Sequence, residues 1–243
     1  MGLRSLAFDI SKPVVAVTMA NGKQGRGVVK HLANSGLFSV RALVRNPQSQ
    51  KSIELLGLPN VEIIKADLLN FDSLINAFDG AYAVFGNTTP TKGWRLFRGS
   101  MVRDYEMSQG RNLVQSIKKM RDKGSLKHFV FSSICKCKDP LLANPAPGHF
   151  SSKWDIEEYI KYNELQELTT ILRPASYFEN FYTTLPLISI ANEYFPGVVH
   201  PDKKWQTIAV EDVGIWANAV LKQPERFIGQ AINLAGEELT GNQ

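Results

Sequence analysis

Residues 14–32, VVAVTMANGKQGRGVVKHL, predict a buried strand, a tight turn and the start of a helix. The apolar run at 14–17 is typical of a strand covered on both faces. Between strand and helix lie Gly22 and Gly25, at the second and third places of a glycine-rich strand-to-helix turn. Met19 stands where the first glycine is usual. The stretch therefore predicts that the chain opens with a β-α unit.

The same alternation of short apolar strands and helices continues along the chain. Right-handed β-α-β units of this kind build an open parallel sheet with helices on both faces. We therefore predict an α/β protein with a Rossmann-like, doubly wound parallel sheet and a small C-terminal lobe. The expected strands are 13–19, 39–44, 60–66, 81–86, 127–132 and 168–173, and the expected helices are 23–35, 71–78, about 97–123, 151–163 and 211–222.

Two stretches lack a clear period. Residues 133–150 hold three prolines and a glycine and predict a long loop, and such loops often act as lids. Residues 181–206 are also expected to be irregular. We therefore expect a dinucleotide-binding domain over about 1–175, to which 205–235 return, and a small lobe over its cleft at 176–204 that is incomplete toward the C-terminus.

The turn before the first helix suits a phosphate group. A helix N-terminus carries unpaired N–H groups and a partial positive charge, and glycines before it let a pyrophosphate approach the backbone. Asn21 tolerates left-handed backbone angles, whereas Met19 leaves the first bend less free. The turn therefore predicts a dinucleotide site around Gly22 and Gly25.

Arg45 ends the second expected strand, where an acidic residue usually binds the ribose 2′-hydroxyl of NAD. No acid lies nearby, and a guanidinium there suits a 2′-phosphate through charge-assisted bidentate bonds. We therefore predict that NADP(H) is preferred over NAD(H); the alternative is an exposed arginine without a ligand. Arg41 lies on the same strand but not at its tip. Asp67, which ends the third strand, is placed to face an adenine edge.

The bulk composition is that of an ordinary globular protein. The 243 residues are 44% hydrophobic and 21% charged, with a net charge of +5. No apolar run approaches the roughly 20 residues that span a bilayer, and the N-terminus does not fit a secretory signal. We therefore expect a cytoplasmic or nuclear location. Basic residues are spread along the chain, which argues against direct binding of nucleic acid.

Two cysteines, Cys135 and Cys137, follow the fifth expected strand. Two cysteines do not support a disulfide scaffold, and a metal would need further ligands near them. We expect neither a disulfide nor a metal site, and both thiols are interpreted as structural or incidental.

With these residues in hand, the chain resembles the NmrA-like family, atypical members of the short-chain dehydrogenase/reductase superfamily. Four segments carry the resemblance: VTMANGKQGRGVVKHL at 17–32, KHFVFSSI at 127–134, HFSSKWDIEEYI at 149–160 and TILRPASYFENF at 170–181. The family's proteins are usually longer than this chain. A substrate site built from their remaining part is therefore not implied.

The resemblance implies a set of dinucleotide contacts. The turn is expected to hold the pyrophosphate, the second and third strands the adenosine, and Lys153 the nicotinamide ribose. The residues so implied are Met19, Asn21, Gly22, Gln24, Gly25, Arg45, Asp67, Leu68, Asn87, Thr88, Thr89, Lys153, Pro174 and Tyr177.

Lys153 falls at the lysine of the superfamily's Tyr-x-x-x-Lys pair, but His149 stands where the tyrosine is expected. In that pair the lysine favours the phenolate, so the phenol can exchange a proton with a substrate oxygen. Lys153 and His149 are therefore the catalytic candidates. A neighbouring lysine disfavours an imidazolium, and the sequence Pro-Gly-His predicts that His149 lies on the loop. Tyr177 is another candidate phenol, and Ser132 and Ser133 are equally available as the superfamily's serine.

Three functions remain open. The first is an NADP(H)-binding, redox-sensing regulator that acts on a protein partner such as a transcription regulator, as the family's namesake does. The second is an NADPH-dependent reductase of quinones or other small carbonyl compounds, since quinones need little acid help to accept hydride. The third and least favoured is a cofactor-free interaction protein. The oligomeric state is left open.

Overall fold

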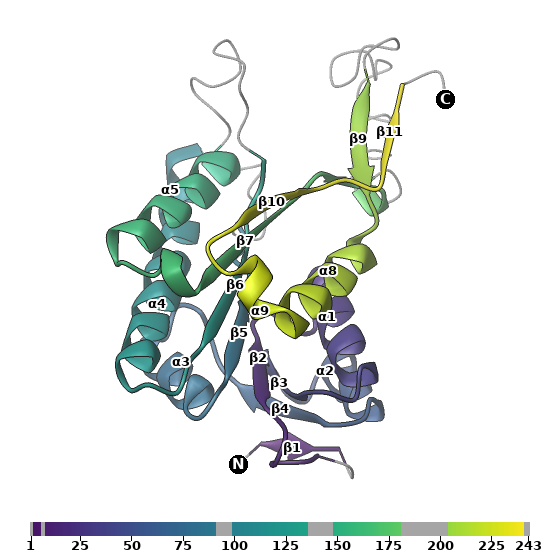
Figure 1. Ribbon diagram of the computed structural model, residues 1–243, viewed down its shortest axis with the longest axis vertical. Coiled ribbons are helices and arrows are strands. Elements are labelled where there is room, and N and C mark those ends of the chain that lie inside the picture. Colours follow the sequence, from purple (N-terminus) through teal and green to yellow (C-terminus); the bar gives the residue numbers. More distant parts are fainter. Residues whose placement is uncertain (1, 6–7, 91–98, 136–147, 181–203, 241–243) are drawn as a thin grey trace.

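The computed structural model describes residues 2–5, 8–90, 99–135, 148–180 and 204–240. Within these residues an eight-stranded sheet forms the centre of the molecule (Figure 1). Its strands are β1 (Leu3–Arg4), β2 (Val14–Val17), β3 (Ser39–Val44), β4 (Val61–Lys65), β5 (Ala83–Gly86), β6 (His128–Ser132), β7 (Thr169–Pro174) and β10 (Ala231–Leu234). Their spatial order is β1-β4-β3-β2-β5-β6-β7-β10. All neighbours pair in parallel except β1, which runs antiparallel to β4 at the edge.

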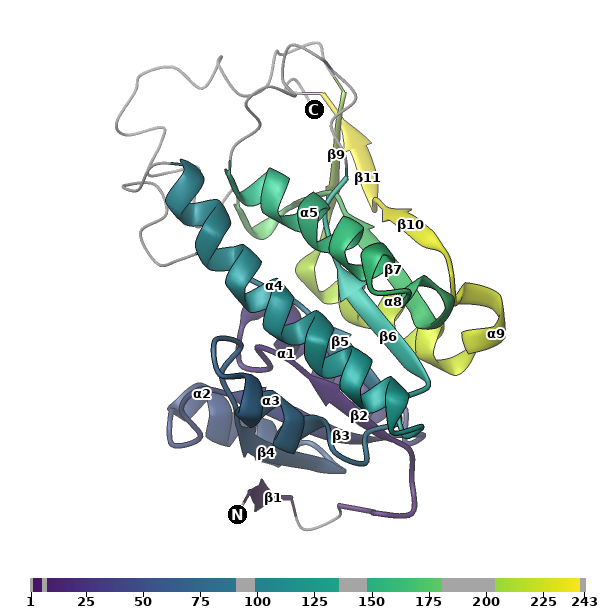
Figure 2. The same cartoon turned by 90° about the vertical axis from the view of Figure 1, so that its left-hand side faces the viewer.

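Helices cover both faces of this sheet. On one face lie α1 (Lys23–Asn34), α2 (Gln50–Ile53), α8 (Val210–Lys222) and α9 (Pro224–Phe227). On the other lie α3 (Phe71–Phe78), α4 (Gly99–Asp122) and α5 (Gly148–Tyr162), which Figure 2 shows in front of the strands. None of the helices within the described residues is long and apolar enough to cross a bilayer.

The order of the strands reverses at β2. From β2 the chain first builds outward through β3 and β4, and then returns to add β5, β6 and β7 on the other side. The connections leave β2 and β5 toward opposite faces, so a crevice opens at the carboxyl ends of these strands. The expected α/β, doubly wound parallel sheet is confirmed.

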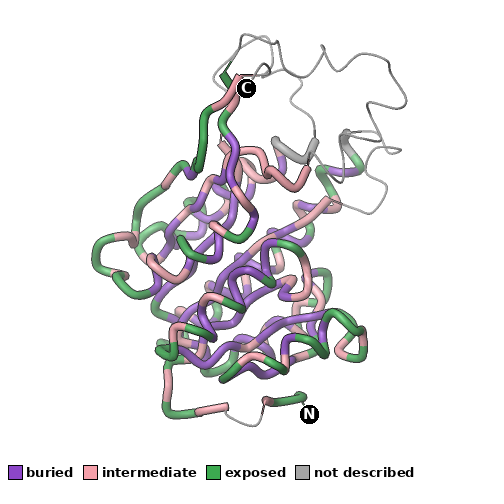
Figure 3. The backbone as a smooth tube through the Cα atoms, turned by 90° about the vertical axis from the view of Figure 1, so that its right-hand side faces the viewer, coloured by how far each residue is buried: buried purple, intermediate pink, exposed green. Residues whose placement is uncertain are grey.

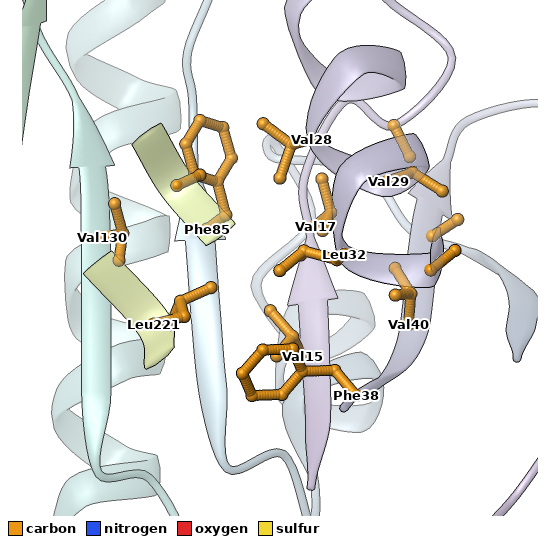
Figure 4. Close-up of a cluster of buried hydrophobic side chains, with 14 of the residues drawn as sticks. Val15, Val17, Val28, Val29, Leu32, Phe38, Val40, Phe85, Val130 and Leu221 are labelled. Carbon is orange, nitrogen blue, oxygen red and sulfur yellow. The ribbon is translucent and has the colours of Figure 1, made fainter. Parts of the chain in front are cut away.

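Alternation along the strands divides the core into two layers. Val15 and Val17 of β2 pack against α1 and α8, whereas Ala16 between them joins the layer under α3, α4 and α5. Figure 4 shows the first layer, with Phe85 of β5 near Val28 of α1. Most residues of the central strands are buried (Figure 3). Each large apolar side chain buried here contributes about 1.5–3 kcal/mol to stability.

Every strand and helix expected from the sequence is present, with ends shifted by a few residues. Two boundaries are corrections. Helix α5 begins at Gly148 rather than residue 151, so the backbone of His149 belongs to its first turn and not to a loop. Residues 205–206, expected to be irregular, begin a strand. The greater part of the two stretches expected to be irregular, 136–147 and 181–203, lies outside the described residues.

A second, three-stranded sheet stands beyond the crevice. It comprises β8 (Ser176–Tyr177), β9 (Trp205–Ile208) and β11 (Glu237–Leu239), in the order β11-β9-β8. The Glu179 carboxylate accepts hydrogen bonds from the Val210 N–H at 3.1 and 3.2 Å and so caps the N-terminus of α8. Helix α8 in turn packs closely on α1, because a Cβ at Gly214 would lie 2.5 Å from the Gly27 carbonyl oxygen.

Candidate functional site

Two adjoining cavities lie along the carboxyl ends of the central strands and share Met19, Gly22 and Thr89 in their walls. The first extends over β3 and β4; its other lining residues are Thr18, Asn21, Leu43, Val44, Arg45, Ala66, Asp67, Leu68, Leu74, Tyr105 and Gln109. The second extends toward β6 and α5; its other lining residues are Lys23, Gln24, Gly25, Asn87, Thr88, Ser132, Ser133, Lys153 and Tyr177. The shared wall consists of the turn between β2 and α1 together with Thr89, which follows β5.

This turn keeps a sharp first bend without a glycine. Met19 takes a left-handed conformation, with φ of 52°, which costs an L-residue about 1–2 kcal/mol. The Gly22 N–H donates to the Met19 carbonyl oxygen at 2.9 Å and closes the turn. A Cβ at Gly25 would lie 2.3 Å from that same oxygen, so only glycine fits there.

The N-terminus of α1 faces the shared wall. Gly22 caps it without a side-chain hydrogen bond, and its first turn holds no acidic residue. Lys23, Gln24 and Gly25 of that turn line the second cavity. The helix dipole and the backbone amides there favour an anion. The turn therefore fits the pyrophosphate of a dinucleotide.

The tip of β3 supplies an available cation to the first cavity. Arg45 is exposed and, among the described residues, has no ion-pair partner. Arg41, on the same strand, is bound instead to buried Glu62 at 2.7 Å. At the tip of β4, the Asp67 Oδ1 accepts from the Leu69 N–H at 2.9 Å, which orients the carboxylate in the cavity wall.

The segment after β5 is anchored on both sides. The Asn87 N–H donates to Thr18 Oγ1 at 2.8 Å, which ties it to the end of β2. The Thr89 N–H and carbonyl bond the side-chain amide of Gln109 on α4 at 3.2 and 3.0 Å. These backbone bonds fix the floor between the two cavities.

The ammonium group of Lys153 forms hydrogen bonds with three oxygen atoms of the protein. Its Nζ donates to Asn87 Oδ1 at 3.0 Å and to the carbonyl oxygens of Thr88 and Ser132 at 2.9 and 3.3 Å. Glu106 of α4 lies 3.4 Å away. Burial lowers the pKa of Lys153, and the Glu106 carboxylate opposes that shift. An ammonium has three hydrogens, so any further acceptor, such as a ribose hydroxyl, would have to replace one of these.

The far end of the second cavity is closed by a hydroxyl pair. The Gln24 Nε2 donates to Ser132 Oγ and to Tyr177 Oη, both at 2.8 Å. Burial and, to a smaller extent, Glu179 raise the pKa of the Tyr177 phenol. Ser133 instead donates to Glu157. Of the two serines, Ser132 is therefore the one that joins the cluster around Gln24.

Most of the residues implied by the resemblance line these cavities. Pro174 does not; it is buried at the end of β7. The side chain of His149 lies outside the described residues. Sequence reasoning missed Tyr105, Glu106 and Gln109, which share α4. The spacing of Tyr105 and Gln109 puts them on one helix face, but the same spacing is typical of a helix that only covers the sheet.

The cysteines and metal ligands add no second site within the described residues. Burial raises the pKa of Cys135, which makes its thiol less reactive. Cys137 lies outside the described residues. No group of three or more candidate metal ligands occurs in the described part of the chain.

Comparison with known proteins gives consistent matches. The NmrA-like oxidoreductase FrzB of Cladobotryum sp. is 30% identical over 237 residues, which cover 90% of this chain and 68% of that protein. The NmrA-like oxidoreductase hkm9 of Aspergillus hancockii is 33% identical over 168 residues, 69% of this chain and 48% of the relative. The chain thus spans between about half and two thirds of the length of these relatives.

Solved structures agree with this. The crystal structure of NmrA, described as a negative transcriptional regulator, superimposes with a TM-score of 0.73 and 26% identity, over 96% of this chain and 69% of NmrA. NmrA has been crystallised with NAD and with NADP. The model of the NmrA-like family matches residues 11–243. The chain therefore belongs to the NmrA-like family.

Proposed function

We propose that this chain binds a nicotinamide dinucleotide across the two cavities, NADP(H) in preference to NAD(H), and acts as a redox-sensing regulator of a protein partner. The observation that carries the proposal is the N-terminus of α1 in the shared wall, which receives no side-chain cap, with Arg45 lining one cavity and Lys153 the other. Binding of NAD and NADP by NmrA supports the class of ligand.

Each end of the ligand has a matching group in this arrangement. The pyrophosphate takes the backbone amides from Gly22 to Gly25, and Arg45 takes the 2′-phosphate. Lys153 lies at the nicotinamide ribose. The small lobe expected at 176–204 lies outside the described residues except for 176–180 and 204. The left-handed conformation of Met19 keeps the turn in shape, which favours cofactor binding over a cofactor-free interaction protein.

A regulatory role is favoured over catalysis because the groups that could donate a proton to a substrate are replaced, engaged or buried. His149 replaces the usual tyrosine, and the hydrogens of Lys153 are engaged by acceptors of the chain. The pKa of Tyr177 is raised by burial. The Tyr177 phenol is therefore not poised to release a proton at neutral pH, and the Lys153 ammonium is held by acceptors of the chain. A dinucleotide that stays bound can still act as a switch if its two redox forms favour different states of the protein.

Titration calorimetry of the purified chain with NADPH, NADP+ and NADH tests the proposal, followed by hydrogen exchange with each form bound. We expect binding of the phosphorylated forms at lower concentration than NADH. We also expect amide protection that differs between the oxidised and reduced complexes. Absence of all binding overturns the proposal, and identical protection in both complexes overturns redox sensing.

A second candidate is an NADPH-dependent reductase of quinones or other small carbonyl compounds. It is favoured by the hydroxyls of Ser132 and Tyr177 at the end of the second cavity, which accept from Gln24 and keep their own hydrogens for a ligand oxygen. Relatives are also named oxidoreductases. NADPH oxidation with a panel of quinones tests it. Turnover that is lost in Lys153→Ala, with NADPH still bound, supports the reductase, and no turnover across the panel rejects it.

A further inference from the structure

A buried carboxylate stands behind the lysine of the second cavity. Glu106 has no exposed surface. Its Oε1 accepts from Thr88 Oγ1 at 2.8 Å and its Oε2 from Ser152 Oγ at 2.6 Å. Its Oε1 also lies 3.4 Å from Lys153 Nζ. These contacts hold Glu106 in one place, so its charge cannot swing away from the ammonium.

The partner ammonium is equally fixed and borders the cavity. The Lys153 side chain is 12% exposed, and its Nζ lies 5.5 Å from the centre of the Phe131 ring. Unlike the exposed ion pairs of the surface, this pair is poorly screened by solvent and salt. Together the two groups present almost no net charge to the cavity, whereas either one alone would present a full charge.

The two redox forms of a nicotinamide dinucleotide differ by one positive charge on the nicotinamide ring. We propose that Glu106 is a specificity-determining residue: by neutralising Lys153, it sets the balance between the oxidised and the reduced dinucleotide. The inference rests on the proposed function, because it takes the second cavity as the nicotinamide end. An unbalanced lysine would repel the oxidised ring, and an unbalanced glutamate would attract it.

Other charges near the cavity do not replace this pair. Glu157 and Arg173 form their own pair behind Ser133, at 2.6 Å, and cancel one another. Lys23 lines the cavity from α1 and stays unchanged in the variants below. The pair of Lys153 and Glu106 is therefore the charge balance that a substitution can alter in either direction.

The first arm of the test is Glu106→Gln, measured at pH 6.5 with NADP+ and NADPH in parallel. The amide keeps an oxygen for hydrogen bonds but removes the negative charge. Burial lowers the pKa of Lys153 and Glu106 opposes this, so mildly acidic conditions keep the lysine charged once the carboxylate is gone. We expect the ratio of the two dissociation constants to shift roughly tenfold toward NADPH.

The second arm is Lys153→Met, measured at pH 8.5, which removes the ammonium and leaves the Glu106 carboxylate without its partner. Removing the positive charge is expected to shift the same ratio roughly tenfold toward NADP+. The double variant, which restores neutrality, is expected to return to the wild-type ratio at both pH values. Structural damage alone does not predict opposite signs in the single variants and cancellation in the double.

Ser152→Ala is the matched control. Ser152 is as buried as Glu106 and donates to the same carboxylate, but its loss changes no charge. We expect its ratio to equal that of the wild type. Thermal unfolding of each variant shows which are folded. If Glu106→Gln does not fold, the shift in the ratio of dissociation constants in Lys153→Met alone decides the test.

An unchanged ratio in the folded single variants, or a shift of the same sign in both, overturns the inference. So does a shift in Ser152→Ala as large as that in Glu106→Gln. Failure of the wild type to bind either dinucleotide is a different result, because it rejects the proposed function itself.

Discussion

The Gln24 side-chain amide donates to the Tyr177 phenol at 2.8 Å, across the end of the second cavity. Gln24 belongs to the first turn of α1, and Tyr177 belongs to β8 of the small second sheet. This hydrogen bond joins the first turn of α1 to the segment beyond the crevice. A substitution of Tyr177 can therefore test both its structural hydrogen bond with Gln24 and the ionisation of its phenol.

Tyr177→Phe is expected to lower the free energy of unfolding by about 1 kcal/mol at pH 7, because Gln24 loses one acceptor. The difference in the free energy of unfolding between the wild type and Tyr177→Phe should become smaller above pH 10. Burial raises the pKa of Tyr177, so above the ordinary value of 10 the unfolded chain releases a proton that the folded chain keeps. The wild type therefore has a loss of stability there that the variant lacks, while the other titrating groups contribute to both proteins. Urea unfolding at pH 7 and above pH 10 measures this; a gap that stays constant contradicts it.

Arg45→Ala tests the choice between the two dinucleotides. The guanidinium is exposed and has no ion-pair partner among the described residues, so its removal breaks no internal contact. We expect the affinity for NADPH to fall about tenfold, from the loss of charge-assisted bonds, while that for NADH is unchanged. The NADPH affinity of Arg45→Lys should lie between those of the wild type and Arg45→Ala, because a lysine keeps the positive charge but loses the bidentate geometry of the guanidinium. If NADPH and NADH weaken together in calorimetry, Arg45 does not read the 2′-phosphate.

Gly25 and Gly27 form a matched pair on α1. A Cβ at Gly25 would lie 2.3 Å from the Met19 carbonyl oxygen, which is backbone and cannot swing aside, whereas a Cβ at Gly27 would meet its nearest atom, Glu211 Cα, at 3.4 Å. Gly25→Ala is expected to cost about 1–3 kcal/mol and to abolish dinucleotide binding. Gly27→Ala should leave both the stability and the dinucleotide affinity almost unchanged. Equal effects of the two substitutions on affinity would show that the close approach at residue 25 is not what shapes the turn.

The fold was predictable from the sequence where the pattern is local. Each central strand is a continuous apolar run, and α1 and α8 follow clear helical spacing. Strands β1 and β10 were not predicted, since they have two and four residues and exist through pairing with distant strands. Nothing in so short a segment distinguishes it from a loop.

The residues of the site also divide into those predictable from local sequence and those that depend on tertiary packing. Gly22, Gly25 and Arg45 were found because their meaning depends on the elements immediately before and after them. Glu106 was not, because a glutamate on a helix of 24 residues is usually solvated. Only the packing of α4 against α5 turns it toward Lys153. Charge pairs between distant elements need the tertiary structure.

Met19→Gly tests the departure from the usual first glycine. Glycine relieves the left-handed strain, but the Met19 side chain packs against the core layer under α3 and α4, so the two effects oppose one another. We expect stability to change by less than about 1 kcal/mol and dinucleotide affinity to rise severalfold, because the side chain leaves the wall shared by the cavities. Met19→Ala loses the same packing but keeps the strain, and should be less stable than Met19→Gly in urea. The reverse order would mean that the strain is negligible.

Acid sensitivity of the fold is expected to arise in part from His128, on β6. Its Nε2 lies 2.8 Å from Thr170 Oγ1. That hydroxyl already donates to the Phe227 carbonyl oxygen at 2.7 Å, so Nε2 must carry the hydrogen. The other ring nitrogen, Nδ1, is buried without a partner among the described residues. Protonation would place an unpaired charged N–H in the interior, and burial accordingly lowers the pKa of His128 to about 4.

Between pH 6.5 and 4 the unfolded chain therefore binds a proton at this histidine that the folded chain does not, and stability falls as the pH falls. The loss reaches at most about 3 kcal/mol at the lower end. His128→Asn should be less stable at pH 7, because it leaves space in a packed layer, but its stability should fall less steeply over the same window. Carboxylates titrate in both proteins, so the difference between the two urea-unfolding profiles isolates the histidine. Parallel profiles would mean that the ring accepts its proton within the fold, with Nδ1 finding a partner there.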